Sequence, residues 1–262
     1  MDGFSWDRRI ARAGELSKTH AAASGLLSFY QGLAGFQKEV FEKLASADDH
    51  SISSLLPYFP RLLSLVRKTG SPALVQAADR LASGSREDWH DLLDGVWQHD
   101  EACANLPAET LFFASALLQP YAEFLAKPEF LAKQSTTSPV DTSQQRCPFC
   151  GSKPQVAVLR PEGDGAKRSL LCSLCSTEWT FRRLVCPNCG EEQKDRLPIF
   201  IATEFDYVRV DACDTCHTYI KAIDLTKNGN AVPVVDELAS VSLNLWATEN
   251  NYQKLSPNLF GV

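Results

Sequence analysis

Four Cys-x-x-Cys pairs between residues 147 and 216 constrain the fold of this chain more than any other feature of its sequence. Two thiolates separated by two residues can reach one metal ion from a single tight turn, and two such turns complete a tetrahedral shell of four sulfurs. The sequence therefore predicts two metal-binding knuckles in tandem. Their candidate ligands are Cys147, Cys150, Cys172, Cys175, Cys186, Cys189, Cys213 and Cys216.

The intervals between the pairs indicate how they combine. Twenty-one residues separate the first pair from the second and twenty-three separate the third from the fourth, but only ten lie between the second and the third. The longer intervals are close to those of four-cysteine zinc sites, so we expect the first two pairs to share one ion and the last two to share another. Gly151 and Gly190 follow the first and third pairs and supply the positive φ that turns backbone N–H groups toward the sulfurs.

Other uses of paired cysteines fit the sequence less well. A disulfide within one Cys-x-x-Cys strains the chain, and residues 1–30 lack the apolar segment of a secretion signal, so we expect a reducing cytoplasm. A thioredoxin-like dithiol needs one pair at the start of a helix, not four pairs. The sequence Cys213-Asp-Thr-Cys216-His217 matches the c-type haem attachment motif, but haem would take two ligands from the second knuckle. We expect His217 to be a solvated neighbour and the lone Cys103 to lie in a core.

The charge distribution argues against a nucleic-acid-binding protein. The chain has 262 residues and a net charge of −6, and its metal-binding half, residues 141–262, carries 13 basic and 15 acidic residues. Zinc ribbons that bind nucleic acid usually present an excess of Lys and Arg to the phosphates. No run of apolar residues approaches the eighteen needed for a transmembrane helix, so we expect no membrane insertion.

Residues 1–133 are expected to form an all-helical bundle of five to seven helices. Between Leu26 and Leu44 apolar residues recur every three or four positions, which indicates one buried face of a long helix. Ser71-Pro72 and Ser85 are favourable helix starts. The last helix is expected from about Glu109 to Lys133, with Pro120 inside it.

Beyond a Ser-, Thr- and Pro-rich segment at 134–145, predicted to be a linker, the sequence changes to short β-prone runs. Such runs are typical of zinc ribbons and rubredoxin-like folds, whose small sheets are held mainly by the metal. The predicted strands are 156–159, 169–171, 198–202, 207–210 and 219–224, and a final helix is predicted at 235–247. The expected fold is a helical bundle followed by two tandem rubredoxin-like or zinc-ribbon domains, at residues 146–184 and 185–262.

Several segments around the cysteines carry a family resemblance. They are Cys-Pro-Phe-Cys-Gly-Ser at 147–152, Cys-Ser-Leu-Cys at 172–175 with Glu-Trp at 178–179, Cys-Pro-Asn-Cys-Gly at 186–190, Val-Asp-Ala-Cys-Asp-Thr-Cys at 210–216 and Val-Val-Asp-Glu-Leu-Ala at 234–239. Together they resemble the formate dehydrogenase accessory protein family, FdhE. Leu-Leu-Gln-Pro-Tyr at 117–121 extends the resemblance into the helical half, whereas the tail at 256–260 departs from the family pattern.

This resemblance implies a cytoplasmic assembly factor that is not itself an enzyme. Members of the family bind the catalytic subunit of molybdenum- or tungsten-dependent formate dehydrogenase and help it to mature. The resemblance also implies that each four-cysteine knuckle holds one metal ion. In the family this ion is associated with iron, and zinc can occupy a similar geometry. We expect the partner to bind in the groove between helices and knuckles, near Trp179, Phe181, Arg182 and Arg183, with Trp179 packed as a lid on the metal site.

Two other functions are compatible with paired cysteines. A rubredoxin-like electron carrier requires iron, because four thiolates on iron can accept and return one electron whereas four on zinc cannot. A nucleic-acid-binding double ribbon is disfavoured by the acidic balance. A complete four-sulfur shell leaves no open coordination position, which argues against hydrolytic metal catalysis.

Overall fold

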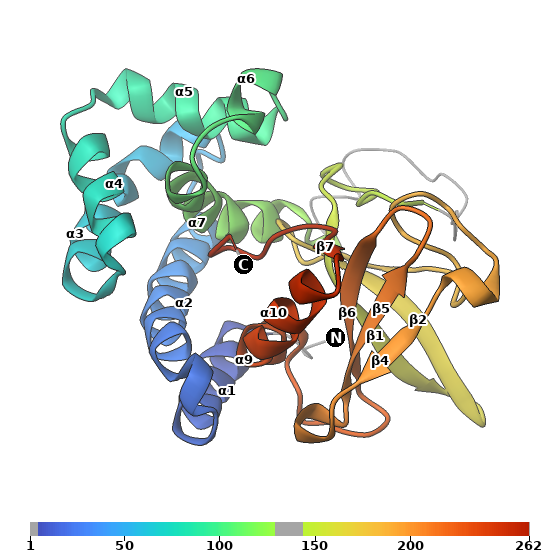
Figure 1. Ribbon diagram of the computed structural model, residues 1–262. Helices are drawn as coiled ribbons and strands as arrows, with labels where there is room; N and C mark the ends of the chain where they lie inside the picture. Colours follow the sequence, from blue (N-terminus) through green and yellow to red (C-terminus); the bar gives the residue numbers. More distant parts are fainter. Residues whose placement is uncertain (1–4, 129–143, 262) are drawn as a thin grey trace.

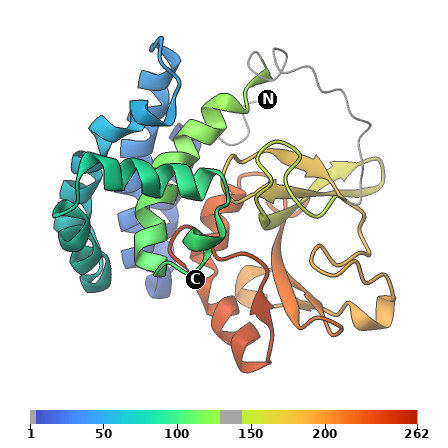
Figure 2. The ribbon, with the colours of Figure 1, turned by 90° about the horizontal axis from the view of Figure 1, so that it is seen from above.

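The computed structural model describes residues 5–128 and 144–261, with a helical region on one side and a sheet on the other (Figures 1 and 2). This confirms the predicted fold of helices followed by a small β region with two four-cysteine clusters. The helices of the first region are α1 (Trp6–Thr19), α2 (Ser24–Ala45), α3 (Phe59–Thr69), α4 (Pro72–Ala82), α5 (Arg86–Trp97), α6 (Glu101–Ala104) and α7 (Ala108–Leu125).

Local capping explains where several of these helices begin. The Ser71 hydroxyl accepts a hydrogen bond from the Leu74 N–H at the start of α4, and Ser85 with Asp88 forms a reciprocal capping box at the start of α5. Both starts were predicted from sequence. The predicted apolar face of α2 is also confirmed, because side chains such as Leu33 and Val40 are fully buried.

The predicted end of the last bundle helix is wrong. Helix α7 ends at Leu125, with Ala126 as its C-cap, rather than at Lys133. Pro128 explains the early end, since a proline disfavours the helical conformation of the residue before it and provides no N–H for the helix. Residues 129–133 and 134–143, the latter predicted to be linker, lie outside the described residues.

The strands are β1 (Pro154–Glu162), β2 (Gly165–Cys172), β3 (Glu178–Thr180), β4 (Ile199–Ile201), β5 (Val208–Cys213), β6 (Thr218–Asp224) and β7 (Gln253–Lys254). They form one sheet, which contains strands from both sides of the predicted division at residue 184. Its order is β3-β2-β1-β6-β5-β4, with β7 pairing beside β6. The two antiparallel meanders, β1-β2-β3 and β4-β5-β6, are joined where β1 runs parallel to β6. The division into two metal domains remains a prediction.

The final predicted helix is broken into two, α9 (Pro233–Ala239) and α10 (Val241–Glu249). At Ser240 the hydroxyl donates back to the carbonyl groups of Asp236 and Glu237, and the Lys221 ammonium group donates to the carbonyl groups of Glu237 and Ser240. These donors occupy carbonyls that a continuous helix would need for its own N–H groups. The single helix predicted at 235–247 is therefore wrong at this position.

Helix α9 lies between the helical region and the sheet (Figure 1), contacting α1 and α2 on one side and β1 and β6 on the other. Every residue of α9 is buried. Alternate side chains of β1 serve two cores: Val156 and Val158 pack with α9 and α1, whereas Ala157 packs with the helices around α7 and with the first cysteine cluster. Strand β1 is thus covered by apolar side chains on both faces.

Candidate metal centres

The first cysteine quartet is formed by two turns at the open end of the β1–β2 hairpin, one just before β1 and one at the end of β2. Its sulfur atoms approach one another at 3.5 Å between Cys147 and Cys175, 3.3 Å between Cys150 and Cys172, and 3.5 Å between Cys150 and Cys175. Three of the four side chains are buried, and Cys150 is half-buried. The four residues form a group that could hold one metal ion.

The second quartet repeats this arrangement 39 to 41 positions further along the chain. Its sulfur atoms lie 3.7 Å apart between Cys186 and Cys216 and 3.7 Å apart between Cys189 and Cys213. Cys186 and Cys213 are buried, Cys216 is half-buried and Cys189 is exposed. The structure therefore brings the eight predicted residues together as two separate groups, in the sequential pairing expected from the intervals.

The sulfur separations fit a metal better than a disulfide. Sulfur atoms about 2.3 Å from one ion at the corners of a tetrahedron lie about 3.8 Å apart, and the measured separations are 3.3–3.7 Å. A disulfide would require about 2.05 Å. All sulfur positions in each quartet lie within 4.8 Å of one another, as a closed four-sulfur shell requires.

Backbone conformation after each pair positions the turns. Gly151 and Gly190 have φ of 73° and 79°, and the residues at the matching positions of the second and fourth pairs, Ser176 and His217, have φ of 53° and 54°. The same left-handed conformation thus recurs after all four pairs, twice without glycine. It brings the Gly151 N–H to 3.0 Å from the carbonyl oxygen of Cys147, and an equivalent bond closes the turn at Gly190.

Hydrogen-bond donors around the sulfurs favour their charged form. The N–H groups of Leu174 and Cys175 point at the Cys172 sulfur, at 3.4 and 3.5 Å, and the Asn188 N–H lies 3.4 Å from the Cys186 sulfur. Such donors stabilise thiolate ligands and orient them. Hydroxyl groups occupy matching positions, with Thr177 beside Cys175 and Thr218 beside Cys216.

Protonation within the first quartet also points to a cation. Hydrogen bonds from the other three thiols hold the pKa of Cys150 far below its usual range, whereas hydrogen bonding to Cys147 and Cys150 raises the pKa of Cys172. Thiolates this close to one another cannot all ionise without a positive charge between them. A metal ion supplies that charge and accepts all four sulfurs as ligands.

Other residues singled out from sequence have clear positions. The His217 side chain is exposed beside the second quartet, as expected. Cys103 is half-buried on α6, outside both quartets, so the expectation of a core position is only partly met. Trp179 is buried with the first quartet and donates to the carbonyl of Gln144, which agrees with a lid. Phe181 is buried too, so it is not available to a partner at the surface of the expected groove.

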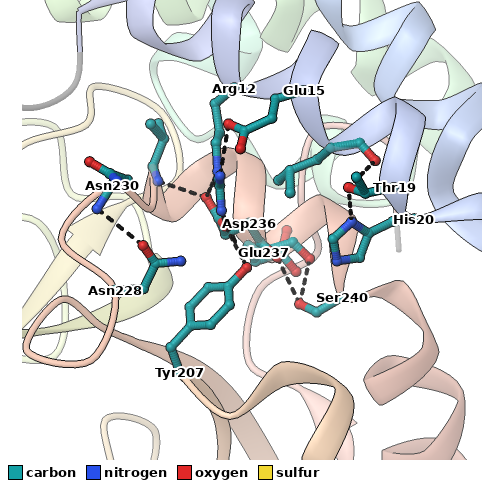
Figure 3. Close-up of polar contacts among 12 residues, drawn as sticks. Arg12, Glu15, Thr19, His20, Tyr207, Asn228, Asn230, Asp236, Glu237 and Ser240 are labelled. Carbon is teal, nitrogen blue, oxygen red and sulfur yellow. Dashed lines mark hydrogen bonds and ion pairs between the residues drawn. The ribbon is translucent and has the colours of Figure 1, made fainter.

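Sequence reasoning missed the buried ionic contacts between the helices and the sheet region. Figure 3 shows Arg12 of α1 and Tyr207 pointing to Asp236 of α9. The Arg12 guanidinium donates to the carboxylate at 2.6 and 3.1 Å, and the Tyr207 hydroxyl at 2.8 Å. Asp236 also accepts from the N–H of Val232 at 2.6 Å. The one available signal was a pair of acids, Asp236 and Glu237, within an apolar segment.

The segments that hold both quartets match models of a known protein family. The family models described as "FdhE, central domain" and "FdhE, C-terminal domain" match residues 146–183 and 171–260. A protein of Aquifex aeolicus named "Protein FdhE homolog" is 35% identical over 216 residues, which are 81% of this chain and 72% of that protein. The chain belongs to the FdhE family.

Further relatives extend the match to the helical region. The FdhE homolog of Pseudomonas aeruginosa strain PAO1 is 32% identical over 217 residues, 78% of this chain and 66% of its own length. The crystal structure of the FdhE protein from Pseudomonas aeruginosa superposes with a TM-score of 0.70 at 25% identity, over 98% of this chain and 95% of that one. The FdhE fold therefore includes the helices as well as both quartets.

Within residues 5–128 and 144–261, no helix is both long enough and apolar enough to cross a membrane.

Proposed function

We propose that this FdhE-family protein is a cytoplasmic accessory factor that binds the catalytic subunit of molybdenum- or tungsten-dependent formate dehydrogenase and assists its maturation. The observation that supports this most directly is the match of both FdhE family models to the segments that hold the quartets. The similarity to the Pseudomonas aeruginosa FdhE structure adds the helical region. The protein itself carries out no catalytic step in this proposal.

We further propose that each quartet holds one iron or zinc ion. The first would be bound by Cys147, Cys150, Cys172 and Cys175, and the second by the other four paired cysteines. Four thiolates would fill the shell of the ion, so its contribution is to fix the turns and, if it is iron, to exchange one electron. The N–H groups that point at Cys172 and Cys186 would offset the negative charge of the bound thiolates.

Deletion of the gene in its own organism tests the proposal. Formate dehydrogenase activity should be lost even when molybdate and tungstate are supplied in excess, and it should return with the wild-type chain. Cys147→Ser and Cys186→Ser should fail to restore activity, because each removes a ligand from one quartet. Cys103→Ser is the matched control, since Cys103 lies outside both quartets, and it should restore activity. Full activity in the deletion strain would rule the proposal out.

Direct capture tests the partner. The purified chain should retain the formate dehydrogenase catalytic subunit from its own cytoplasm, and should prefer the subunit made without molybdenum or tungsten cofactor. Equal capture by the Cys147→Ser variant would show that an intact first quartet is not needed for binding. Metal analysis of protein purified without oxygen identifies the ion in each preparation.

A second candidate function is supported by the exposure of Cys189, which brings the second quartet to the surface. An exposed iron centre is suited to exchange electrons with a partner, as in a rubredoxin-like carrier. This function requires iron and a reversible colour change on reduction. A colourless zinc protein isolated from its own cells would exclude it.

A further inference from the structure

The surroundings of the two quartets differ although their geometry repeats. In the first quartet the ligand with greatest exposure is Cys150, which is half-buried, whereas in the second Cys189 is exposed and Cys216 half-buried. The first quartet belongs to the apolar core that contains α7 and Trp179. A reagent in solution therefore reaches the second quartet more easily than the first.

Helices from the first half of the chain hold the turns of the first quartet. His99, in the α5–α6 connection, forms a 2.7 Å hydrogen bond from its Nε2 to the carbonyl oxygen of Cys150. Gln119 of α7 donates from its side-chain amide to the carbonyl oxygen of Ser173 at 3.0 Å. Both acceptors lie within Cys-x-x-Cys turns, so these bonds form only while the turns keep their shape.

A buried ion pair makes a third contact with the turns of the first quartet. Ser176, the left-handed residue after the second pair, donates to the Glu123 carboxylate of α7 at 2.7 Å and accepts from Arg9 of α1 at 3.2 Å. Arg9 and Glu123 themselves lie 2.7 Å apart, with side chains 5% and 12% exposed. Helices α1 and α7 therefore meet the sheet at the rim of the first quartet.

The turns of the second quartet bond instead to segments of the sheet region. Thr215 donates to Glu191 at 2.6 Å, from one turn of the quartet to the other. Tyr252 donates to Asp214 at 2.6 Å, and the N–H of Gln253 in β7 donates to the carbonyl oxygen of His217 at 2.8 Å. None of these three bonds reaches α1 or α7.

From these contacts we propose that the two metals have different tasks. The first metal fastens the helical region to the sheet, because it fixes the turns to which α1, α7 and His99 bond. The second metal exchanges with the solution and leaves that docking intact. This inference rests on the proposed metal binding and adds a division of labour to it.

Matched ligand variants test the inference on the purified full chain. Cys150→Ser removes one ligand from the first quartet, and Cys189→Ser removes the equivalent ligand from the second quartet. Each of these residues is the second cysteine of the pair that begins its quartet. Hydrogen–deuterium exchange should show that Cys150→Ser lowers protection in α1 and α7 by about tenfold or more, equivalent to about 1.4 kcal/mol. Cys189→Ser should leave α1 and α7 protected and loosen only the segments around residues 186–191 and 213–218.

A chelator tests the exchange directly. With the wild-type chain, half of the bound metal should leave at least about tenfold faster than the rest, and iodoacetamide should label Cys189 first. If Cys150→Ser does not fold, His99→Gly still decides the matter. It removes one contact between the helical region and the first quartet, keeps all four ligands and suits the positive φ of 57°.

His217→Gly is the matched control, since His217 also has a positive φ and lies beside the second quartet. The metal of the first quartet and the helix contacts are coupled, and such coupling is reciprocal. His99→Gly should therefore speed the loss of the metal from the first quartet at least about threefold, and His217→Gly should not. Release of both metals at one rate, or loosening of α1 and α7 by Cys189→Ser, would overturn the inference. A wild-type chain that binds no metal would instead refute the proposed metal centres.

Discussion

The Lys221 ammonium group lies 2.9 Å from the Glu237 carboxylate, and both side chains are fully buried between the sheet and α9. Lys254 approaches the same carboxylate oxygen at 2.5 Å. The other oxygen accepts hydrogen bonds from Gln155 at 3.3 Å and Asn258 at 3.0 Å. One carboxylate therefore joins β1, β6, α9 and the C-terminal segment, and its charge is compensated only while these elements stay together.

We predict that Glu237→Gln destabilises the protein by about 3–5 kcal/mol, because it leaves the buried Lys221 without its counter-charge. Urea unfolding at pH 7 measures the loss. Glu249→Gln is the control: Glu249 is exposed at the end of α10, and its replacement should change the free energy of unfolding by less than about 0.5 kcal/mol. Equal unfolding midpoints for the two variants would contradict the prediction.

Acid should weaken the same cluster. Burial alone raises the pKa of Glu237, but the opposite effect of Lys221 and Lys254 is larger. The net result lowers the pKa from its ordinary value of 4.5 to about 2. Because the folded pKa is the lower one, the contribution of Glu237 is complete above about pH 4.5 and is lost as the pH falls toward 2. The free energy of unfolding, measured between pH 6 and 3, should fall less steeply in Glu237→Gln than in the wild type. Parallel curves would argue against this role.

The Arg12–Asp236 pair allows a comparison of two acids that share one arginine. Asp236 is fully buried, whereas the Glu15 side chain, 2.9 Å from the same guanidinium, is 65% exposed. Asp236→Asn should cost about 3 kcal/mol, since Arg12 and Tyr207 lose a charged acceptor in the interior. Glu15→Gln should cost less than about 1 kcal/mol. Thermal unfolding of both variants tests the difference, and equal losses would show that burial does not decide it.

The quartets were predictable from sequence because their chemistry is local. Each Cys-x-x-Cys is one turn, and the interval to the next pair indicates its partner. The helix starts at Ser71 and Ser85 were predictable for the same reason, since a cap is formed by neighbours in the chain. Glycine marked two of the four left-handed positions, but Ser176 and His217 adopt that conformation without such a signal.

The features that could not be predicted from sequence depend on contacts between residues far apart in the chain. The break in the last helix follows from Lys221, which reaches its carbonyl groups from β6. Strands β3 and β7 have three and two residues, too few for a period to be recognised, and pairing with β2 and β6 defines them. Buried charges such as Asp236 resemble surface residues until the fold supplies their partners.

The left-handed turn at Gly190 provides a last test, and one that concerns metal retention. Its φ of 79° is a conformation that a residue with a Cβ adopts at a cost of about 1–2 kcal/mol. Gly190→Ala should therefore destabilise the third Cys-x-x-Cys turn and weaken metal binding at the second quartet about fivefold to thirtyfold, because each 1.4 kcal/mol is a factor of ten.

Gly229→Ala is the matched control, since Gly229 is exposed, has no positive φ and has room for a Cβ. It should leave metal affinity within about twofold of the wild type. Competition with a coloured chelator measures both variants, and the first quartet within each chain serves as an internal reference, because its own glycine is unchanged. If Gly190→Ala retained its metal as firmly as Gly229→Ala, the turn would tolerate a side chain, and the left-handed conformation would not be what holds Cys186 and Cys189 in place for the ion.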